Sequence, residues 1–481
     1  MPTQSVDPRT GQSFGPVIAD SSTDDVDQVV RAASSAFPAW CDMSAAARAL
    51  ALTGVAGALD ARADDLVALA DRETGLGLPR LAGELERTTF QLRMFAAAVE
   101  SGEHFRAVDD PEVTGPPPAG HPAMRRVLVP LGPVAVYGAS NFPFAFSVPG
   151  GDTASALAAG CPVVVKAHPA HPQTSAAVAE LMDSALVAAG APAGTLGIVK
   201  GLEAGRLLVV HPLVRAAAFT GSYGGGRALF DLAAGRPDPI PFYGELGSVN
   251  PVVVTKGAAS RGQALAAGYV DSLTLGTGQF CTNPGLLLVP AGSGLLELIV
   301  AEAALRPAGV LLHAGVAQLL RSNVARLAAV AGVRTMVDLS RPDGPGAHSG
   351  PVILAVDAPT ALAHPTLVRT ECFGPAALVV EYGSNEELLD VLALLDGCLV
   401  AAVHGEEDEP VARTLVGQLA SIAGRVVWNG WPTGVAVTAG QQHGGPHPAT
   451  TSSLHTSVGT AAVARFLRPV AYQSMPPGLM P

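Results

Sequence analysis

The chain has 481 residues, of which 48% are hydrophobic and 15% are charged; this balance excludes an extended disordered protein and allows two or three domains. The formal net charge of −12 arises from 29 basic and 41 acidic residues without a basic cluster, so we expect no nucleic-acid partner. Four prolines interrupt the longest uncharged stretch, 127–151, which therefore cannot form a membrane-spanning helix. Because the N-terminus does not resemble a secretory signal, we expect a cytoplasmic location.

Five cysteines are spread along the chain without close pairs: Cys41, Cys161, Cys281, Cys372 and Cys398. Their odd number and wide spacing argue against a disulfide framework and against a zinc site. Since a free cysteine usually behaves as a small buried hydrophobe, at most one or two of the five should carry chemistry.

The N-terminal region, about 24–105, has a helical pattern. Asp24 can cap a first helix, the stretch 44–75 predicts two more, and 84–102 predicts a fourth with apolar residues three and four positions apart. A proline-rich loop follows at 108–123.

Strands and helices alternate after Arg125. We expect strands at 127–129, 134–138, 162–168, 195–201 and 216–222, and helices at 150–160, 174–190, 203–212 and 224–235. This alternation predicts βαβ units and a parallel sheet, on which nucleotides bind at strand–turn–helix junctions. Residues of about 125–245 therefore form a doubly wound nucleotide domain in this prediction.

A second α/β unit begins with the strand 250–255 and closes near 424–432. The tail ends in a strand-like segment at 466–473. A lone terminal strand needs a partner, which the strand near 124–130 or a second subunit could supply.

Two residues in glycine-containing peptides are candidates for chemistry. Cys281 lies in GTGQFCTNPG, where an exposed thiol could attack a carbonyl, although base rates favour a buried inert cysteine. Glu245 lies in PFYGELGS before an apolar strand, where burial would raise its pKa towards neutrality and suit a general base. The alternative for Glu245 is a helix cap or an arginine partner.

Three further features each allow a functional interpretation and a purely structural one. Asn141 follows a strand and could donate to an oxyanion or simply form a turn. Lys166 ends a strand and could reach a cofactor ribose or phosphate, or extend into solvent as a surface lysine. The segment 219–227, FTGSYGGGR, provides a glycine turn before a helix and favours a pyrophosphate, although glycine richness alone is weak evidence.

In combination, these peptides resemble the aldehyde dehydrogenase superfamily. SNFPFAF, VVVKAHP, FTGS, ELGS, GQFC and ECFGP follow one another in that superfamily's order and spacing over about 230 residues. The C-terminal segment 429–473 resembles the NADP-dependent branch that oxidises α-ketoglutarate semialdehyde (2,5-dioxopentanoate) and that also contains fatty aldehyde dehydrogenases.

The resemblance implies an α/β fold with three parts. A Rossmann-type NAD(P)-binding domain would comprise 1–112 and 133–246, and an α/β catalytic domain would comprise 247–455. A small β oligomerisation element would comprise 113–132 and 456–481 and assemble a homodimer or homotetramer.

The resemblance also implies roles for individual residues. Cys281 would attack the aldehyde, Asn141 and the Cys281 backbone N–H would hold the oxyanion, and Glu245 would activate the water that hydrolyses a thioester. The cofactor would contact Lys166, His168, Gly201, Gly205, Gly221, Ser222, Gly226, Leu246, Glu371 and Phe373. The substrate would contact Arg93, Phe146 and Thr282.

Cofactor choice depends on the position three residues after Lys166. NAD-preferring relatives often carry a glutamate there, and this chain has Pro169. Without that carboxylate, Lys166 and His168, with Arg206, can meet a 2′-phosphate, so we expect NADP to be preferred and NAD to be possible.

Two substrate classes fit the sequence. Arg93 or Arg87 could bind the far carboxylate of a semialdehyde, although both could instead form salt bridges. Three phenylalanines in SNFPFAF, at 142, 144 and 146, could equally line a tunnel for a long aliphatic aldehyde.

Two histidines near the C-terminus, His443 and His447, lack acidic or cysteine neighbours at ligand spacing. We therefore expect them to have a loop role and the protein to hold no metal. A non-redox esterase and a silent binding protein are the competing classes. The apparent dinucleotide site argues against the esterase, and the retained Cys281, Glu245 and Asn141 argue against the silent protein.

Overall fold

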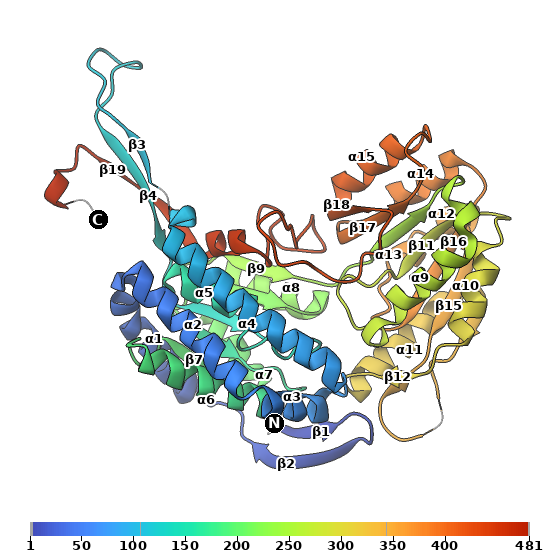
Figure 1. Cartoon of the computed structure of the whole chain (residues 1–481), viewed down its shortest axis with the longest axis horizontal. Helices are drawn as coiled ribbons and strands as arrows, with labels where there is room; N and C mark the ends of the chain where they lie inside the picture. Colours follow the sequence, from blue (N-terminus) through green and yellow to red (C-terminus); the bar gives the residue numbers. More distant parts are fainter. Residues whose placement is uncertain (1–2, 106, 343, 480–481) are drawn as a thin grey trace.

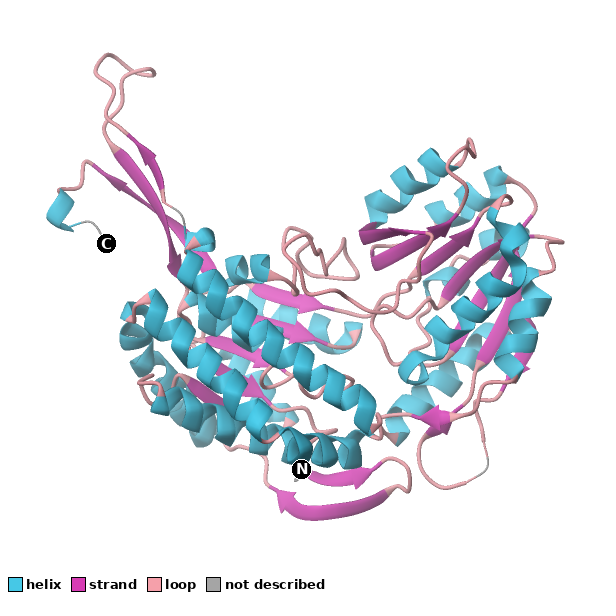
Figure 2. Cartoon of the chain, viewed as in Figure 1, coloured by secondary structure: helices cyan, strands magenta, loops and turns pink. Residues whose placement is uncertain are grey.

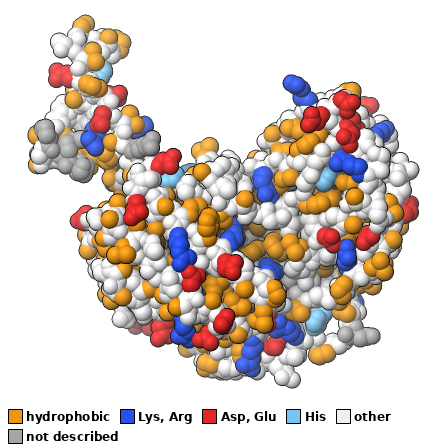
Figure 3. All heavy atoms as spheres, viewed as in Figure 1, with side chains coloured by type: hydrophobic (Ala, Val, Ile, Leu, Met, Phe, Trp, Pro, Cys, Tyr) orange, Lys and Arg blue, Asp and Glu red, His pale blue; other side chains and the backbone are white. Residues whose placement is uncertain are grey.

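Two α/β bodies and a projecting three-stranded sheet make up the computed structural model of the chain, which describes residues 3–105, 107–342 and 344–479 (Figures 1 and 2). No described helix combines the length and hydropathy that a membrane span needs. Acidic and basic side chains intermingle on the face shown in Figure 3.

The first body contains a five-stranded parallel sheet in the order β7-β6-β5-β8-β9. These strands are rich in valine and alanine and mostly buried, because helices cover both faces of a parallel sheet. The order reverses at β5, so the carboxyl ends of β5, β6 and β8 border the crevice where such sheets bind ligands. The strands are β5 (Val134–Tyr137), β6 (Val163–Lys166), β7 (Leu196–Val199), β8 (Ala216–Thr220) and β9 (Phe242–Glu245).

Helices cover both faces of this sheet and form two hydrophobic cores. One face packs against α2 (Ala45–Ala61), α3 (Ala63–Thr74), α4 (Leu78–Ser101), α5 (Gly151–Ala159) and α6 (Pro172–Ala188). The other packs against α1 (Thr23–Asp42), α7 (Leu202–Val210) and α8 (Tyr223–Ala234). The α/β alternation expected from the sequence is confirmed.

The first helix begins slightly earlier than predicted. Ser22, not Asp24, is its N-cap, because the Ser22 hydroxyl accepts from the Asp25 N–H while the Asp25 carboxylate accepts from the Ser22 N–H. The sequence pattern also did not predict the N-terminal antiparallel hairpin β1 (Thr3–Asp7) and β2 (Gln12–Ile18).

The second body contains a seven-stranded sheet in the order β13-β15-β16-β11-β10-β17-β18, in which only the β13 pairing is antiparallel. Its strands are β10 (Pro251–Val254), β11 (Leu286–Pro290), β13 (Arg334–Asp338), β15 (Val352–Asp357), β16 (Ala376–Tyr382), β17 (Cys398–His404) and β18 (Ala423–Trp428). A separate pair comprises β12 (Gly309–Val310) and β14 (His348–Ser349).

Two further cores lie on either side of this sheet. Helices α9 (Gly262–Thr274) and α10 (Leu295–Ala304) pack on one face, after the short helix η2 (Ala258–Arg261). The other face packs against α11 (Ala314–Ala328), α12 (Ala358–Ala363), α13 (Thr366–Arg369), α14 (Asn385–Ala393) and α15 (Ala412–Ile422).

The projecting sheet has the order β19-β4-β3 and stands away from both bodies (Figure 1). The terminal strand β19 (Leu467–Gln473) pairs with β4 (Met124–Pro130), which is one of the two partners expected for it. The sheet also includes β3 (Val108–Asp110), whose residues the domain prediction assigned to the nucleotide domain.

The chain returns to the first body after β18. Leu246 N–H donates to Ala449 O, and Glu245 forms a bridge with Thr450. The short helix η4 (Thr460–Phe466) then leads into β19. This return brings residues about 200 positions apart together at the carboxyl end of β9.

Candidate active site

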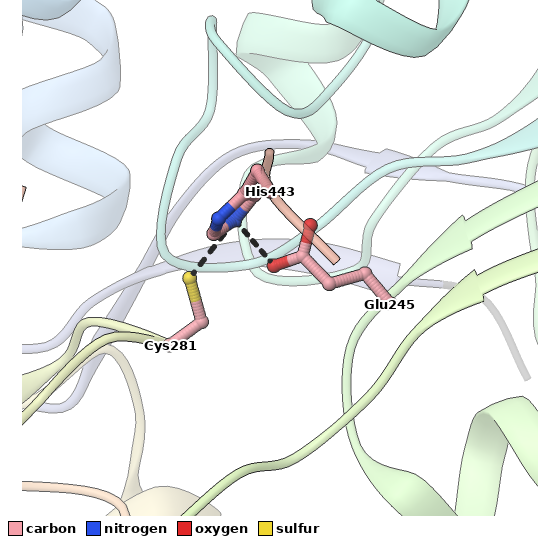
Figure 4. Close-up of side chains that lie close together, drawn as sticks. All are labelled: Glu245, Cys281 and His443. Atoms are coloured by element: carbon pink, nitrogen blue, oxygen red, sulfur yellow. Dashed lines mark hydrogen bonds and ion pairs between the residues drawn. The ribbon is translucent and has the colours of Figure 1, made fainter. Parts of the chain in front are cut away.

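Cys281, His443 and Glu245 form a contiguous cluster between the two bodies (Figure 4). Cys281 lies on the turn between η3 (Leu275–Gly278) and β11, Glu245 ends β9, and His443 lies in the segment after β18. Cys281 Sγ is 3.6 Å from His443 Nε2, which is 2.9 Å from Glu245 Oε1. One imidazole nitrogen thus contacts both the thiol and the carboxylate.

Hydrogen bonds hold the histidine and the carboxylate in place. Ser457 Oγ donates to Glu245 Oε2 at 2.8 Å, and Ser457 N–H donates to His443 O at 2.9 Å. His443 N–H donates to Thr456 Oγ1 at 2.9 Å. A cavity of about 20 Å³ adjoins Glu245, His443 and Ser457, which is room for one water molecule.

The electrostatics of the pair differ from the sequence-based expectation. Burial alone would raise the pKa of Glu245, but contact with His443 and the Ser457 hydroxyl outweighs it, so the net pKa is lowered. The expectation that burial would bring Glu245 towards neutrality was therefore wrong, and this carboxylate is ionised at neutral pH. Burial, with the Glu245 charge second, raises the pKa of Cys281 well above its ordinary value.

The buried side-chain amide of Asn250 fixes the turn that carries Cys281. Asn250 Nδ2 donates to Cys281 O at 2.8 Å and to Asn283 O at 3.0 Å. Thr277 has a φ of +58°, and a Cβ on Gly278 would lie 2.2 Å from the Gly374 carbonyl carbon. Backbone strain and close packing therefore hold the nucleophile's turn in one conformation.

Asn141 lies next to the same turn. Its Nδ2 donates to Gln279 O at 3.0 Å, and its side chain is buried. The amide predicted to hold an oxyanion therefore donates to the carbonyl of Gln279, two residues before Cys281 in the chain. Thr282, predicted as a substrate contact, is buried directly after Cys281.

Two charged residues of α4 hold the loop that contains Asn141. Arg80 Nη2 donates to Asn141 O at 2.8 Å, and its guanidinium lies 5.1 Å and 4.7 Å from the ring centroids of Phe142 and Phe280. Since Phe280 precedes Cys281, Arg80 connects the amide loop to the nucleophile's turn. This connection could not be recognised from the helical pattern of α4.

Glu84, one turn further along α4, binds the same loop. Its Oε1 accepts from the N–H groups of Phe144 and Ala145 at 2.8 and 2.9 Å. Burial raises the pKa of Glu84 to about 7, against the opposing influence of Arg80. Arg80 and Glu84 are therefore positioning residues for the Asn141 loop.

A cavity of about 510 Å³ lies between the two bodies and is large enough for a small molecule or part of a cofactor. Its lining includes Tyr223, at the start of α8, and Glu371. A Cβ on Gly247 would lie 2.3 Å from Glu371 Oε2, so only glycine leaves this carboxylate in place. Burial raises the pKa of Glu371 to about 7.

The start of α8 suits a pyrophosphate. Ser222 caps the helix and accepts from the Gly225 N–H at 3.3 Å, and Gly221 precedes the cap. A Cβ on Gly226 would lie 2.1 Å from Leu246 Cδ2, so the helix could not approach β9 with a larger residue there. Backbone N–H groups and the helix dipole at this end favour an anion.

The far end of the crevice holds Lys166 at the end of β6. A Cβ on Gly205 would lie 3.3 Å from Lys166 Cγ, and one on Gly201 would lie 2.5 Å from Asp20 Cγ. Burial lowers the pKa of Lys166, and the Asp20 charge opposes that shift. The structure thus places a carboxylate from the N-terminal segment beside Lys166, which the peptide KAHP did not indicate.

His168 contributes little positive charge there. Burial, His171 and Lys166 lower the pKa of His168 well below its ordinary value, and its Nδ1 accepts from the Ala170 N–H at 3.1 Å. Arg206, also expected near a 2′-phosphate, forms a 3.6 Å ion pair with Glu203 on the surface. The lysine is the main cation of this end.

Aromatic rings line the approach to the thiol. Phe146 lies 6.1 Å from the His443 ring and 5.3 Å from Phe142, measured between centroids. Phe373 lines a small cavity together with Phe280 and Glu371. Phe144 is fully buried, so it belongs to the core and not to a tunnel.

The two candidate arginines of α4 lie in different environments. Arg93 pairs with Asp60 at 2.6 Å on the surface, as the salt-bridge alternative predicted. Arg87 lies 5.3 Å from the Phe146 ring and donates to Val435 O at 3.5 Å. Arg87, not Arg93, faces the thiol's side of the molecule.

His443 was set aside in the sequence because it has no acidic or cysteine neighbour nearby in the chain, and the fold supplies both from a distance. The expected loop role was wrong for this residue. His447 lies elsewhere, with its ring 5.9 Å from Tyr223. Asn250, Arg80, Glu84 and Asp20 were also missed because each acts through tertiary contacts.

A thiol beside the crevice of a doubly wound sheet suits an enzyme that binds a nucleotide cofactor and forms a covalent adduct with its substrate. The sequence profile of the aldehyde dehydrogenase family matches residues 2–469. The chain belongs to this family and is an aldehyde-oxidising oxidoreductase that uses a nicotinamide cofactor.

Two curated relatives match almost the whole chain. Alpha-ketoglutaric semialdehyde dehydrogenase 2 of Azospirillum brasilense is 45% identical over 99% of this chain and 92% of its own length. Alpha-ketoglutaric semialdehyde dehydrogenase of Acinetobacter baylyi is 39% identical with the same coverage. Among solved structures, a putative aldehyde dehydrogenase from Burkholderia cenocepacia has a TM-score of 0.83 at 25% identity and covers 100% of this chain and 95% of its own.

Proposed function

We propose that this enzyme oxidises 2,5-dioxopentanoate (α-ketoglutarate semialdehyde) to 2-oxoglutarate. The two semialdehyde dehydrogenases that match nearly the full chain support this substrate. The observation that carries the proposal is a pair of guanidiniums on the thiol's side of the site, Arg87 and Arg425.

The two arginines suit a substrate with a remote carboxylate. Burial lowers the pKa of both guanidiniums; Glu84, then Cys281 and Glu245, oppose the shift for Arg87, and Cys281 opposes it for Arg425. Arg87 donates to Val435 O and Arg425 donates to Pro432 O, so both border one segment. Among the residues that the structure describes, no carboxylate lies within ion-pair distance of either. An anionic substrate group would therefore complete the site.

The mechanism begins with proton transfer from the thiol. Cys281 loses its proton to solvent water while His443 Nε2–H donates to the ionised Glu245 carboxylate, and Sγ bonds to the aldehyde carbon. The Asn141 amide and the Cys281 N–H stabilise the oxyanion, with one such donor contributing about 3–4 kcal/mol. A bound nicotinamide cofactor would supply the hydride acceptor, and loss of hydride from the adduct carbon would leave a thioester on Sγ.

The ionised Glu245 completes the reaction by taking a proton from water. The water oxygen attacks the acyl carbon, the carbon–sulfur bond breaks, and the acid leaves. His443 holds Glu245 Oε1, while Ser457 holds Oε2, so the base keeps one orientation. Neither step requires these side chains to leave the cluster.

We further propose that NADP is the preferred cofactor. Lys166 supplies a cation for a 2′-phosphate, and Pro169 replaces the glutamate of many NAD-preferring relatives. Lys166, Gly201, Gly205 and His168 would hold the adenosine end, Gly221, Ser222 and Gly226 the pyrophosphate, and Leu246, Glu371 and Phe373 the nicotinamide end. A higher kcat/KM with NAD than with NADP would contradict this preference.

The enzyme is proposed to be a cytoplasmic homodimer or homotetramer with the domain boundaries given above. The projecting sheet supports assembly, because it stands away from both bodies and its two edge strands, β19 and β3, offer unpaired backbone groups to a partner (Figure 1). Light scattering of the purified protein tests this, and a monomer would contradict it.

The test of substrate choice compares two aldehydes. The wild type should oxidise 2,5-dioxopentanoate with a kcat/KM at least about tenfold above that for hexanal, since a desolvated charge pair is worth at least 1.4 kcal/mol. Arg87→Gln should remove most of this preference while leaving hexanal oxidation unchanged. The matched control Arg93→Gln, on the same helix, should preserve it.

A medium- or long-chain aliphatic aldehyde is the second candidate. The edge-to-face contacts of Phe142 with Phe146 and Phe280 give the site an apolar wall that favours it. Equal or greater activity on hexanal, unaffected by Arg87→Gln, would replace the semialdehyde with this class.

A further inference from the structure

The cluster around the nucleophile also has the composition of a transition-metal site. Glu245, Cys281 and His443 each offer one ligand atom, and the three atoms lie within 4.8 Å of one another. They are a thiol sulfur, an imidazole nitrogen and a carboxylate oxygen, which together are the ligands that Zn²⁺ prefers. Figure 4 shows the Cys281 sulfur and a Glu245 oxygen both next to the His443 ring.

The distances are close to those of a tetrahedral site. Bonds of about 2.3 Å to sulfur and about 2.1 Å to nitrogen and oxygen place sulfur about 3.6 Å from nitrogen and nitrogen about 3.4 Å from oxygen. The structure has 3.6 Å between Cys281 Sγ and His443 Nε2 and 2.9 Å between His443 Nε2 and Glu245 Oε1. The third edge, between Cys281 Sγ and the Glu245 carboxylate oxygen, lies within 4.8 Å, so movement of the carboxylate towards the ion would complete the geometry.

We propose that Cys281, His443 and Glu245 bind one Zn²⁺ ion, with water as the fourth ligand, and that this ion reversibly inhibits the enzyme. Binding replaces the thiol proton, which passes to solvent, by a sulfur–zinc bond. The thiolate and the carboxylate together neutralise the two charges of the ion. The nucleophile and the hydrolytic base are then both occupied by one ion.

The ligands are held in place before any ion arrives. Asn250 fixes the carbonyl of Cys281, Thr456 binds the His443 N–H, and Ser457 holds the second carboxylate oxygen of Glu245. Of these three contacts, the bond from Ser457 binds a ligand group itself, and a partner of that kind typically accounts for a 10–100-fold difference in affinity. Mg²⁺ and Ca²⁺ prefer all-oxygen sites and should not bind here. The inference does not depend on which aldehyde is the substrate.

The experiment measures metal binding directly and uses the full-length protein. Titration with Zn²⁺ in a calorimeter should give one ion per chain, and Co²⁺ should produce the absorption of a tetrahedral thiolate complex. His443→Gln should weaken Zn²⁺ binding at least about tenfold, and Cys281→Ser should remove the thiolate band. The control Cys41→Ser, a half-buried cysteine of α1, should bind as the wild type does.

Alkylation provides a second measurement that is independent of turnover. One equivalent of Zn²⁺ should protect Cys281, but not Cys41, from iodoacetamide, and EDTA should restore both alkylation and activity. Unchanged Zn²⁺ affinity in His443→Gln, or a cobalt complex without a thiolate band, would overturn the proposal. A wild-type protein that binds Zn²⁺ as expected but does not oxidise aldehydes would instead count against the proposed function alone.

Discussion

Glu84→Gln isolates the effect of a buried carboxylate that positions the Asn141 loop. The glutamine oxygen can still accept from the N–H groups of Phe144 and Ala145, as Oε1 does in the wild type. Oε2 is buried and has no hydrogen-bond partner among the described residues, so an amide group replaces it without breaking a bond. The variant therefore keeps the shape of the Glu84 side chain but has no group that titrates at this position.

The magnitude follows from the pKa of Glu84, which burial raises from 4.5 to about 7 in the folded protein. A carboxyl group with a raised pKa binds its proton more tightly when folded, so the free energy of unfolding falls as pH rises from about 4.5 to about 7. A shift of about 2.5 pKa units corresponds to about 3 kcal/mol, which is fully lost above pH 7.

The assay is urea unfolding at pH 5 and pH 8, followed by tryptophan fluorescence in a variant that keeps Trp40, which is buried in the same domain, and replaces Trp428 and Trp431 by Phe. Glu84→Gln should gain about 2–3 kcal/mol relative to the wild type between these two pH values. If the difference in the free energy of unfolding between variant and wild type is the same at pH 5 and pH 8, the raised pKa of Glu84 is wrong. Because the loop stays bound, kcat at pH 8 should change less than threefold, or about 0.6 kcal/mol.

Three further substitutions test other parts of the site. Asn141→Ala should lower kcat about 10²–10³-fold with little change in KM, measured by cofactor reduction at 340 nm, because an oxyanion donor is lost. Asp20→Asn should raise the ratio of kcat/KM for NADP to that for NAD, since a carboxylate near Lys166 is neutralised; an unchanged ratio would separate Asp20 from cofactor choice. Asn250→Ala should lower the free energy of unfolding by about 3 kcal/mol, because two buried carbonyls lose their donor, and a change below 1 kcal/mol in urea unfolding would contradict it.

Much of the architecture is readable from sequence because parallel sheets leave strong local signals. The strands around Val164 and Ala217 are short apolar runs between helices with their own periodicity, so their type follows from local pattern. The hairpin at 3–18 lacks such a pattern, since most of its β2 residues are exposed. Its two strands can be recognised only from their pairing with each other in the structure.

The site was predictable only where a peptide carries its function locally. Cys281, Glu245 and Asn141 lie in peptides that resemble the family, and the fold gathers them. His443 lies 162 positions from Cys281, and its contact is created by the return of the chain after β18. The lowered pKa of Glu245 has the same origin, because it depends on His443 and Ser457 and not on neighbours in sequence.

The central claim is that Cys281 carries the substrate as a thioester which Glu245 then hydrolyses. Mass spectrometry of Glu245→Gln, mixed with NADP and 2,5-dioxopentanoate, tests it most directly. The account predicts a burst of about one NADPH per active site and an acyl adduct on the Cys281 peptide. Steady turnover at the parent rate without any adduct on Cys281 would contradict it.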